Sequence, residues 1–126
     1  MAESCTITEE THGTVKKVKF VWVSAAGGTV GAAAVNSTTT NAYSGEIVRL
    51  VTVPATAGDQ PDDNYNVTVL DADGNDVLMG AGLLRDEATT EQVLASSLGI
   101  VANDTLKLMV TAAGAGLGGT VYVYIR

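Results

Sequence analysis

Hydrophobic and polar residues alternate along several short stretches of the chain, which is the pattern of β-strands that bury one face. In residues 14–24, TVKKVKFVWVS, the side chains of Val18, Phe20 and Trp22 fall on one face. Lys17 and Lys19 fall on the other. The chain has one phenylalanine and one tryptophan, and both lie in this stretch. We therefore expect a strand here that contributes Phe20 and Trp22 to the main core.

A second strand is predicted in residues 45–54, GEIVRLVTVP, where nearly every position of residues 47–53 is apolar except Arg49 and Thr52. A strand of this composition lies in the middle of a sandwich or faces a partner subunit. Arg49 is expected to mark the outward side.

Two further strands are predicted in residues 104–113 and 120–126. The second, TVYVYIR, alternates aliphatic residues with Tyr122 and Tyr124. These tyrosines either form an exposed amphipathic strip of the kind favoured at protein interfaces, or pack across strands against their neighbours. The GAGLGG sequence between the two strands is expected to be a flexible turn, because it has no Lys-Ser/Thr pair and leads into a strand instead of a phosphate-binding helix.

Residues 65–80, YNVTVLDADGNDVLMG, have the pattern of a hairpin. Its acidic run DADGND begins at Asp71 and ends at Asp76, and is either a tight turn or a calcium loop. A helix-flanked calcium loop needs a glutamate at its twelfth position, which here is Gly82. The Asp73-Gly74 pair suits a tight turn. We therefore favour the turn, and leave open a weak cation site among the carboxylates.

The connections between these strands are less regular. Residues 29–38, TVGAAAVNST, are predicted as a strand of small side chains, and residues 55–65 as a long loop that is either a partner contact or a solvated excursion. In residues 87–95 one short helix is expected, with Asp86 as its cap. The alternative is an extended loop that packs its leucines and valine (Leu83, Leu84, Val93, Leu94) over one end of a sheet.

Residues 1–13 are acidic and polar, and are predicted to form an N-terminal arm. The arm is either disordered or pairs as an extended strand with a neighbouring subunit. Residues 14–126 then form one domain, as expected for this length.

The fold class that follows is all-β: an antiparallel sandwich or barrel of about seven or eight strands, either jelly-roll-like or immunoglobulin-like. Composition agrees, with 14 glycines, 2 prolines and 5% aromatic residues in 126. The core is therefore expected to consist mainly of small aliphatic side chains.

The formal charge of −7 disfavours nucleic-acid binding, because a chain this acidic repels phosphate backbones. No stretch approaches the roughly 20 apolar residues of a membrane helix, and the N-terminus lacks the features of a signal peptide. We therefore expect a protein made in the cytosol that stays soluble or joins an assembly there.

Candidate catalytic chemistry is scarce. Cys5 and His12 are the only cysteine and the only histidine, and both lie in the predicted arm. They are a poor basis for a metal site or for a Ser-His-Asp arrangement. A sugar site normally shows aromatic platforms, whereas Phe20 and Trp22 are assigned to the core. No catalytic, metal-binding or cofactor-binding residue is predicted, and the protein is not expected to be an enzyme.

Four stretches together, VKKVKFVWVS, AYSGEIVRLVTVP, DNYNVTVLDADGNDVL and GTVYVYIR, resemble small structural proteins of tailed bacteriophages. The resemblance spans roughly residues 14–126 and lies in strand patterns, so no functional residue is carried over. It implies a virion protein assembled in the host cytoplasm. Proteins of this size and class often decorate or cement the capsid, commonly as trimers.

The role that this resemblance implies is a capsid decoration protein that binds the major capsid protein or another virion protein. Such a protein needs a rigid sandwich and a contact surface, but no pocket. The alternatives are a tail, neck or fibre-attachment component, and a β-sandwich that binds a receptor or a carbohydrate.

Overall fold

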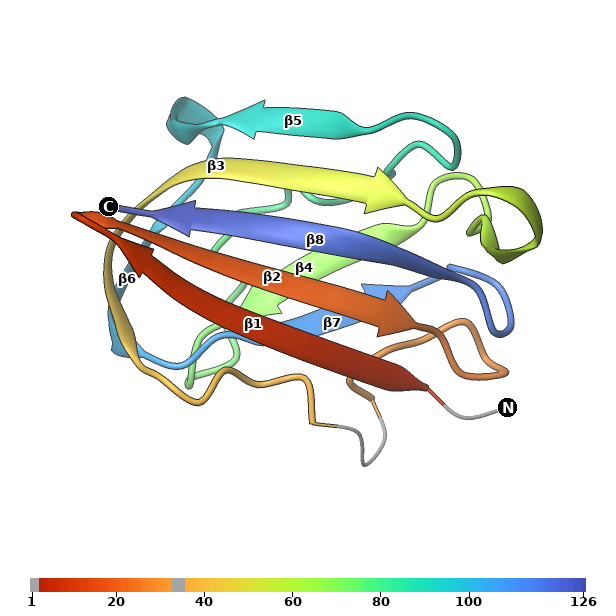
Figure 1. The fold of residues 1–126 in the computed structure, drawn as a ribbon, viewed down its shortest axis with the longest axis horizontal. Coiled ribbons are helices and arrows are strands. Elements are labelled where there is room, and N and C mark those ends of the chain that lie inside the picture. The colour runs from red at the N-terminus through yellow and green to blue at the C-terminus, as the bar shows by residue number, and fades with distance from the viewer. Residues whose placement is uncertain (1–2, 33–35) are drawn as a thin grey trace.

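The computed structural model describes residues 3–32 and 36–126, and in these ranges the chain forms a two-layer β-sandwich (Figure 1). The larger sheet has the strand order β1-β2-β8-β3-β5, with β6 paired to the start of β3, and the smaller sheet pairs β4 with β7. All these pairings are antiparallel. The strands are β1 (Ser4–His12), β2 (Val15–Val23), β3 (Tyr43–Pro54), β4 (Asn66–Leu70), β5 (Glu91–Leu94), β6 (Ile100–Asp104), β7 (Lys107–Thr111) and β8 (Gly118–Ile125). The predicted all-β fold class is confirmed.

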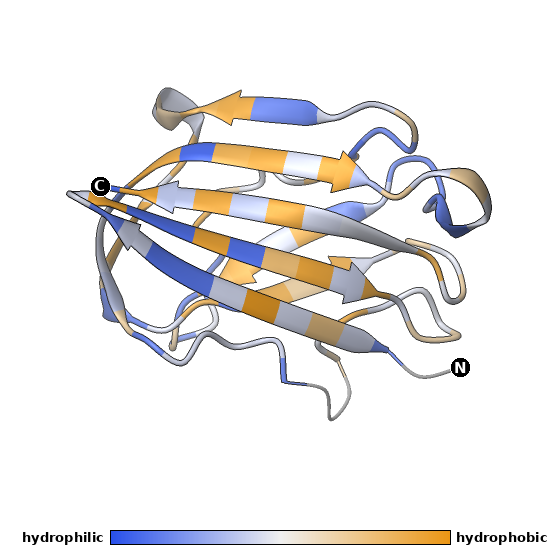
Figure 2. Ribbon diagram, viewed as in Figure 1, coloured by the Kyte–Doolittle hydropathy of each residue, from blue (hydrophilic) through white to orange (hydrophobic). Residues whose placement is uncertain are grey.

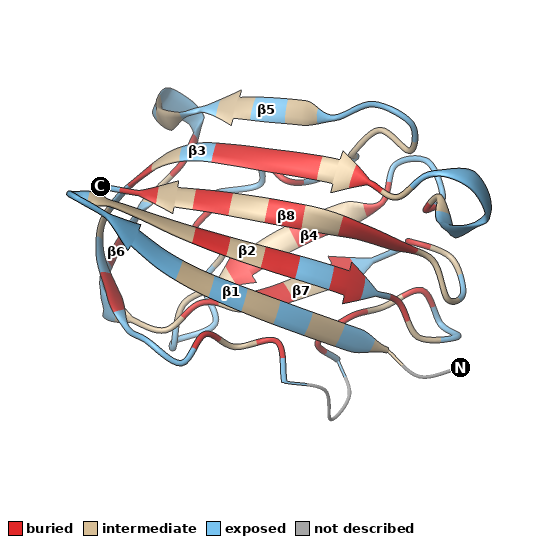
Figure 3. Ribbon diagram, viewed as in Figure 1, coloured by how far each residue is buried: buried red, intermediate tan, exposed pale blue. Residues whose placement is uncertain are grey.

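The core lies between the two layers and is built by the predicted alternation. Figure 2 shows hydrophobic and hydrophilic bands alternating along β2, and Figure 3 shows the matching bands of buried and less buried residues on β2 and β8. Val18, Phe20 and Trp22 are at most 1% exposed, as predicted. The Trp22 and Tyr65 rings lie 5.6 Å apart between centroids and link the larger sheet to the segment entering β4. The other fully buried large side chains are Ile47, Leu50, Leu78, Leu106, Leu108, Ile125, Val30 and Val67.

The predicted arm is part of the larger sheet. Residues 4–12 form β1, which pairs with β2 through nine consecutive residue pairs, from Ser4 opposite Val23 to His12 opposite Val15. Cys5 and Ile7 face inward and pack against the core. A boundary at residue 13 therefore separates two strands of a hairpin and not an arm from a domain. An extended strand is one of the two alternatives predicted for residues 1–13, but β1 pairs with a strand of its own chain and not with a neighbouring subunit.

The segment predicted as a short helix is a strand. Residues 91–94 form β5, paired with Arg49–Thr52 of β3, and a 3₁₀ turn, η2 (Ala95–Ser97), follows. Asp86 does accept the N–H groups of Ala88 and Thr89, as a cap would. Residues 91–94 then form a strand and not a helix, because they pair with the free edge of β3. Of the four side chains expected to cover the sheet end, only Val93 packs against the core.

The turn at residues 71–76 is confirmed, but the hairpin around it is short. Asp71 Oδ1 accepts the N–H groups of Asp73 and Asn75 at 3.0 and 2.9 Å, and Gly74 has a φ of +85°. One bridge, Leu70 to Asp76, joins the two arms. After it the chain enters a series of turns, and β4 takes β7 as its strand partner.

Two residues of the irregular connection between β2 and β3 add isolated bridges to the smaller sheet. Val30 and Thr38 each make a single bridge to β7, at Val110 and Lys107. The small-residue strand predicted around them is thus reduced to isolated bridges in its described part, and residues 33–35 lie outside the described residues. The loop at residues 55–65 contains one 3₁₀ turn, η1 (Ala57–Asp59).

Candidate functional site: the outer face of the larger sheet

The outer face of the larger sheet gathers side chains from β2, β8 and β3 that are far apart in sequence. In one row of the register, Lys17 lies opposite Tyr124, and Tyr124 lies opposite Arg49. In the next row, Lys19 lies opposite Tyr122. We call these five residues the tyrosine–cation strip. It lies on the side of the sheet opposite the core, because the alternate residues of β2 and β8 are buried. Figure 1 shows β4 and β7 behind the larger sheet.

The two rings of the strip are stacked and covered by cations. The centroids of Tyr122 and Tyr124 are 6.4 Å apart, with an angle of 21° between the ring planes. The Nζ atoms of Lys17 and Lys19 lie 5.3 and 5.8 Å from the Tyr122 centroid, and Arg49 Cζ lies 5.0 Å from the Tyr124 centroid. These distances are within the range of cation–π attraction. Cross-strand packing of the tyrosines is therefore confirmed, and both rings stay partly exposed.

The strip concentrates positive charge on an acidic chain. It holds three of the seven basic residues, whereas the whole sequence has 14 acidic residues and a net charge of −7. Gln92 on β5 accepts hydrogen bonds from Arg49 Nε and Nη2 at 3.0 and 2.7 Å, which fixes the guanidinium above its ring. The surface therefore offers three cations beside aromatic rings, with one carboxylate, Glu10 of β1, opposite Lys17 at its edge. The excess of cations suits an acidic partner.

A shallow apolar depression continues the same face toward the start of β8. Its floor is Gly118, which has no side chain, and its walls include Val21, Val23 and Val53. We call these four residues the valine groove. The depression has a volume of about 500 Å³, and Val21 and Val23 are 39% and 37% exposed. Thus one face carries a cationic aromatic half and an apolar half.

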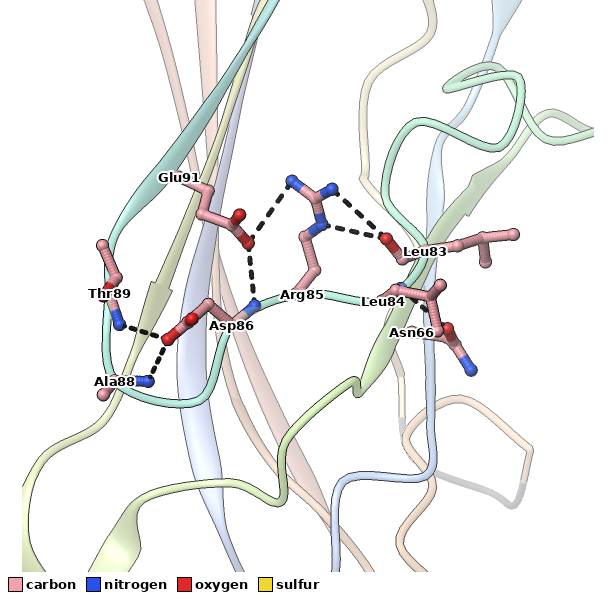
Figure 4. A network of polar contacts seen from close by, with 8 residues as sticks. All are labelled: Asn66, Leu83, Leu84, Arg85, Asp86, Ala88, Thr89 and Glu91. Carbon is pink, nitrogen blue, oxygen red and sulfur yellow. Dashed lines mark hydrogen bonds and ion pairs between the residues drawn. The ribbon is translucent and has the colours of Figure 1, made fainter.

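A second exposed apolar feature is a loop at residues 83–87, which we call the leucine loop. Leu83 and Leu84 are 43% and 66% exposed. Leu84 has a φ of +55°, a left-handed conformation that is unfavourable for a branched side chain. Its N–H donates to Asn66 Oδ1 at 3.0 Å, which holds the backbone in that conformation (Figure 4).

The rest of the leucine loop is held by a polar network around Arg85 and Glu91 (Figure 4). Glu91 Oε1 accepts the Asp86 N–H at 2.7 Å and lies 3.7 Å from Arg85 Nη1. Nε and Nη2 of Arg85 also donate to the Leu83 carbonyl oxygen, each at 3.2 Å. Hydrogen bonds from the Ala88 N–H, and then from Thr89, lower the pKa of Asp86. The loop therefore presents two leucines and an ionised carboxylate on a fixed backbone.

On its inner side, β1 is anchored by Glu9. Its carboxylate accepts the N–H groups of Thr40 and Asn41 at 2.9 and 3.1 Å and the Tyr43 hydroxyl at 2.6 Å. Partial burial raises the pKa of Glu9, but the hydrogen bonds together outweigh it and hold the pKa below its ordinary 4.5. Burial first, and then the hydrogen bond to Glu9, raise the pKa of Tyr43. An inward-pointing charge of this kind also protects an edge strand from unwanted pairing.

Replacing Glu9 with glutamine is expected to lower the free energy of unfolding at neutral pH by about 1 kcal/mol, because a charged acceptor is lost from a partly solvated site. The folded-state pKa is depressed, so the contribution of the carboxylate is complete above the ordinary Glu pKa of 4.5 and is lost as the pH falls through the lower folded value. Urea unfolding at several pH values measures this. A difference between the two proteins that stays constant down to the most acidic pH would contradict it.

The residues considered for catalysis or metal binding are not brought together. Cys5 and His12 lie on one strand, seven positions apart, which separates them by about 23 Å. Burial, and then the charge of Glu3, raise the pKa of the Cys5 thiol to about 11, so the weakly nucleophilic protonated form dominates at neutral pH. His12 Nε2 lies 3.1 Å from Glu10 Oε1 on the surface. Within the described ranges, no three His, Cys, Asp or Glu side chains are grouped to hold a metal.

Sequence reasoning placed each member of the strip on the outward side of its strand but did not bring them together. The sequence pattern does not show which strands are neighbours. β8 follows all the other strands in sequence, yet it lies between β2 and β3 in the sheet. The sequence does not indicate that Leu83 and Leu84 are exposed. It shows only an apolar pair followed by Arg85 and Asp86.

No helix in the described part of the chain is long and apolar enough to cross a membrane. Comparison with known proteins gives no match: no protein-family model matches the chain, and no curated protein or solved structure is significantly similar to it.

Proposed function

We propose that this protein is a non-enzymatic structural component of a tailed-phage virion, and specifically a decoration protein that binds the outside of the head. The observation that supports the contact surface best is the tyrosine–cation strip. It concentrates positive charge around two stacked rings on a chain of net charge −7. The assignment to a virion rests on the resemblance of the strand sequences.

The proposed partner is the major capsid protein, or another virion protein, at an acidic patch. Aromatic and arginine side chains are enriched where proteins bind each other, and the rings of the strip are held by their neighbours before binding. Little side-chain conformational freedom is then lost on association, which favours affinity. Several copies on one oligomer, a trimer by the resemblance, would add avidity.

The test is binding of the purified protein to phage particles assembled without it, measured by co-sedimentation. Charge reversal Lys19→Glu is expected to weaken binding at least tenfold, because it places a like charge against the acidic patch. Reversing Lys17 and Arg49 as well is expected to abolish binding. Added salt should weaken binding of the unchanged protein, since a partly exposed cationic surface is screened.

Lys107→Glu is the matched control. It changes the net charge by the same amount, but Lys107 lies on β7 in the other layer. If both variants bind equally well, the strip is not the contact surface. Electron microscopy of the complexes then locates the protein: density on the tail or neck favours the alternative role, and no binding to particles argues against a virion role. Binding of the same protein to a glycan array would instead favour a carbohydrate-binding module.

A further inference from the structure

We propose that the leucine loop of one copy of this protein docks in the valine groove of a second copy, so that copies join head to tail. This inference concerns self-association and does not depend on the virion role. Its two surfaces are different parts of the same chain, and neither is used by the fold itself.

The leucine loop has the properties of a preformed knob. Leu84 is 66% exposed and adopts a φ of +55°, so it combines two unfavourable features in one residue. Nothing in the fold requires a large apolar side chain there, because a glycine or asparagine would adopt this φ more readily. The hydrogen bonds from Leu84 to Asn66 and from Asp86 to Glu91 hold the loop in place. A rigid loop binds with less loss of entropy than a flexible one.

The valine groove has the matching properties. Gly118 lines the depression on β8, and Val21 and Val23 expose apolar surface beside it on β2. The depression is about 500 Å³ in volume, which is large enough for leucine side chains. Burying exposed apolar surface from both sides supplies the driving force.

Charge also favours this pair of surfaces. Asp86 and Glu87 follow the two leucines directly, and Lys19 is two residues from Val21 on the same face of β2. Asp59 lines the groove at its other end, next to residues 53–56, and is the one acidic group there. We therefore orient the incoming loop with its carboxylates toward Lys19 and away from Asp59. Two copies with a charge of −7 each would otherwise repel.

Within one chain the loop does not fill its own groove. The loop leads into β5, and β3 and β8 separate β5 from β2 in the sheet. None of residues 83–87 is among the residues that line the groove. Contact between two different surfaces of identical copies is heterologous, and it closes into a ring if the rotation allows or otherwise continues as a filament.

The decisive variant is Leu84→Gly, measured by analytical ultracentrifugation. Glycine removes the apolar side chain and relieves the unfavourable φ, so the variant is expected to keep its melting temperature or gain a few degrees. We expect its self-association to weaken by at least about 30-fold. Its mass should fall toward the 12.9 kDa of one chain.

Met79→Gly is the matched control, because Met79 is also exposed, at 71%, and has a φ of +54°, but lies outside the leucine loop. It is expected to associate like the unchanged protein. If Met79→Gly and Leu84→Gly weaken association equally, or neither does, the leucine loop is not the contact. An unchanged protein that stays monomeric at its highest soluble concentration overturns the proposal outright.

A mixing experiment tests the head-to-tail arrangement. Val23→Asp places a carboxylate in the groove, so this variant alone should also be monomeric. Leu84→Gly keeps an intact groove and Val23→Asp keeps an intact loop, so an equimolar mixture is expected to form a one-to-one dimer of twice 12.9 kDa. A mixture that remains monomeric contradicts the contact between loop and groove.

Discussion

Replacing Trp22 with alanine is expected to lower the free energy of unfolding by about 3–5 kcal/mol, which approaches the whole stability of a small domain. Trp22 is 1% exposed and packs against the Tyr65 ring at 5.6 Å. A Cβ on Gly119 would lie 2.9 Å from its Cζ2 atom, which shows how closely the indole fits against β8. Removing it leaves a cavity that a β-sandwich with hydrogen-bonded layers cannot close by relaxing.

Equilibrium unfolding in urea, followed by circular dichroism, measures this effect. Trp22→Phe is the control, because it keeps an aromatic ring in the same space and removes only part of the volume. The indole Nε1 atom is buried without a hydrogen-bond partner among the described residues, so losing it should cost little by itself. We expect Phe to retain most of the stability. Equal losses for Ala and Phe would show that cavity size does not set the effect.

The second large effect is expected for Gly31→Ala, which should lower the free energy of unfolding by about 3 kcal/mol or more. Gly31 has a φ of +88°, and a Cβ there would lie 2.5 Å from the Leu108 carbonyl oxygen and 2.7 Å from Met109 Sδ. The oxygen belongs to the backbone of β7, so it cannot move aside without displacing that strand. Strain in the backbone and a steric clash therefore act together.

Gly74→Ala separates these two causes. Gly74 has nearly the same φ, +85°, but a Cβ there would meet no atom within 4 Å. It is therefore expected to lower stability by only about 1 kcal/mol, from backbone strain alone. Thermal unfolding of both variants beside the unchanged protein gives the comparison. Similar losses at the two positions would mean that the close approach of β7 to Gly31 contributes nothing.

Strands with strong alternation could be predicted from the sequence, because burial of one face leaves a period of two. This holds for β2, where Phe20 is predicted in the core, and for β8, where aliphatic residues alternate with the tyrosines: Phe20 and Val123 are both fully buried. The partners of these strands could not be predicted. Local alternation says which face is buried, but strand order depends on contacts between distant parts of the chain.

The errors at β1 and β5 have related causes. β1 contains Glu9 and Glu10, and a charged sequence suggests a solvated arm; the inward Glu9 is instead satisfied by Thr40, Asn41 and Tyr43. Around β5, Asp86 accepts two backbone N–H groups as a helix cap would, but no helix follows, because the free edge of β3 offers backbone hydrogen bonds that decide the outcome. In both cases tertiary pairing overrides a local preference.

The position of β8 has a consequence for the order in which the fold can form. β8 is the last of the eight strands in the described sequence, yet it lies between β2 and β3 and pairs with both. Until residues 118–125 leave the ribosome, the β1–β2 hairpin and the β3–β5 pair have no strand to join them. The larger sheet therefore cannot close before β8 has been synthesised, and its closure depends on a pairing between residues about a hundred positions apart, which slows folding.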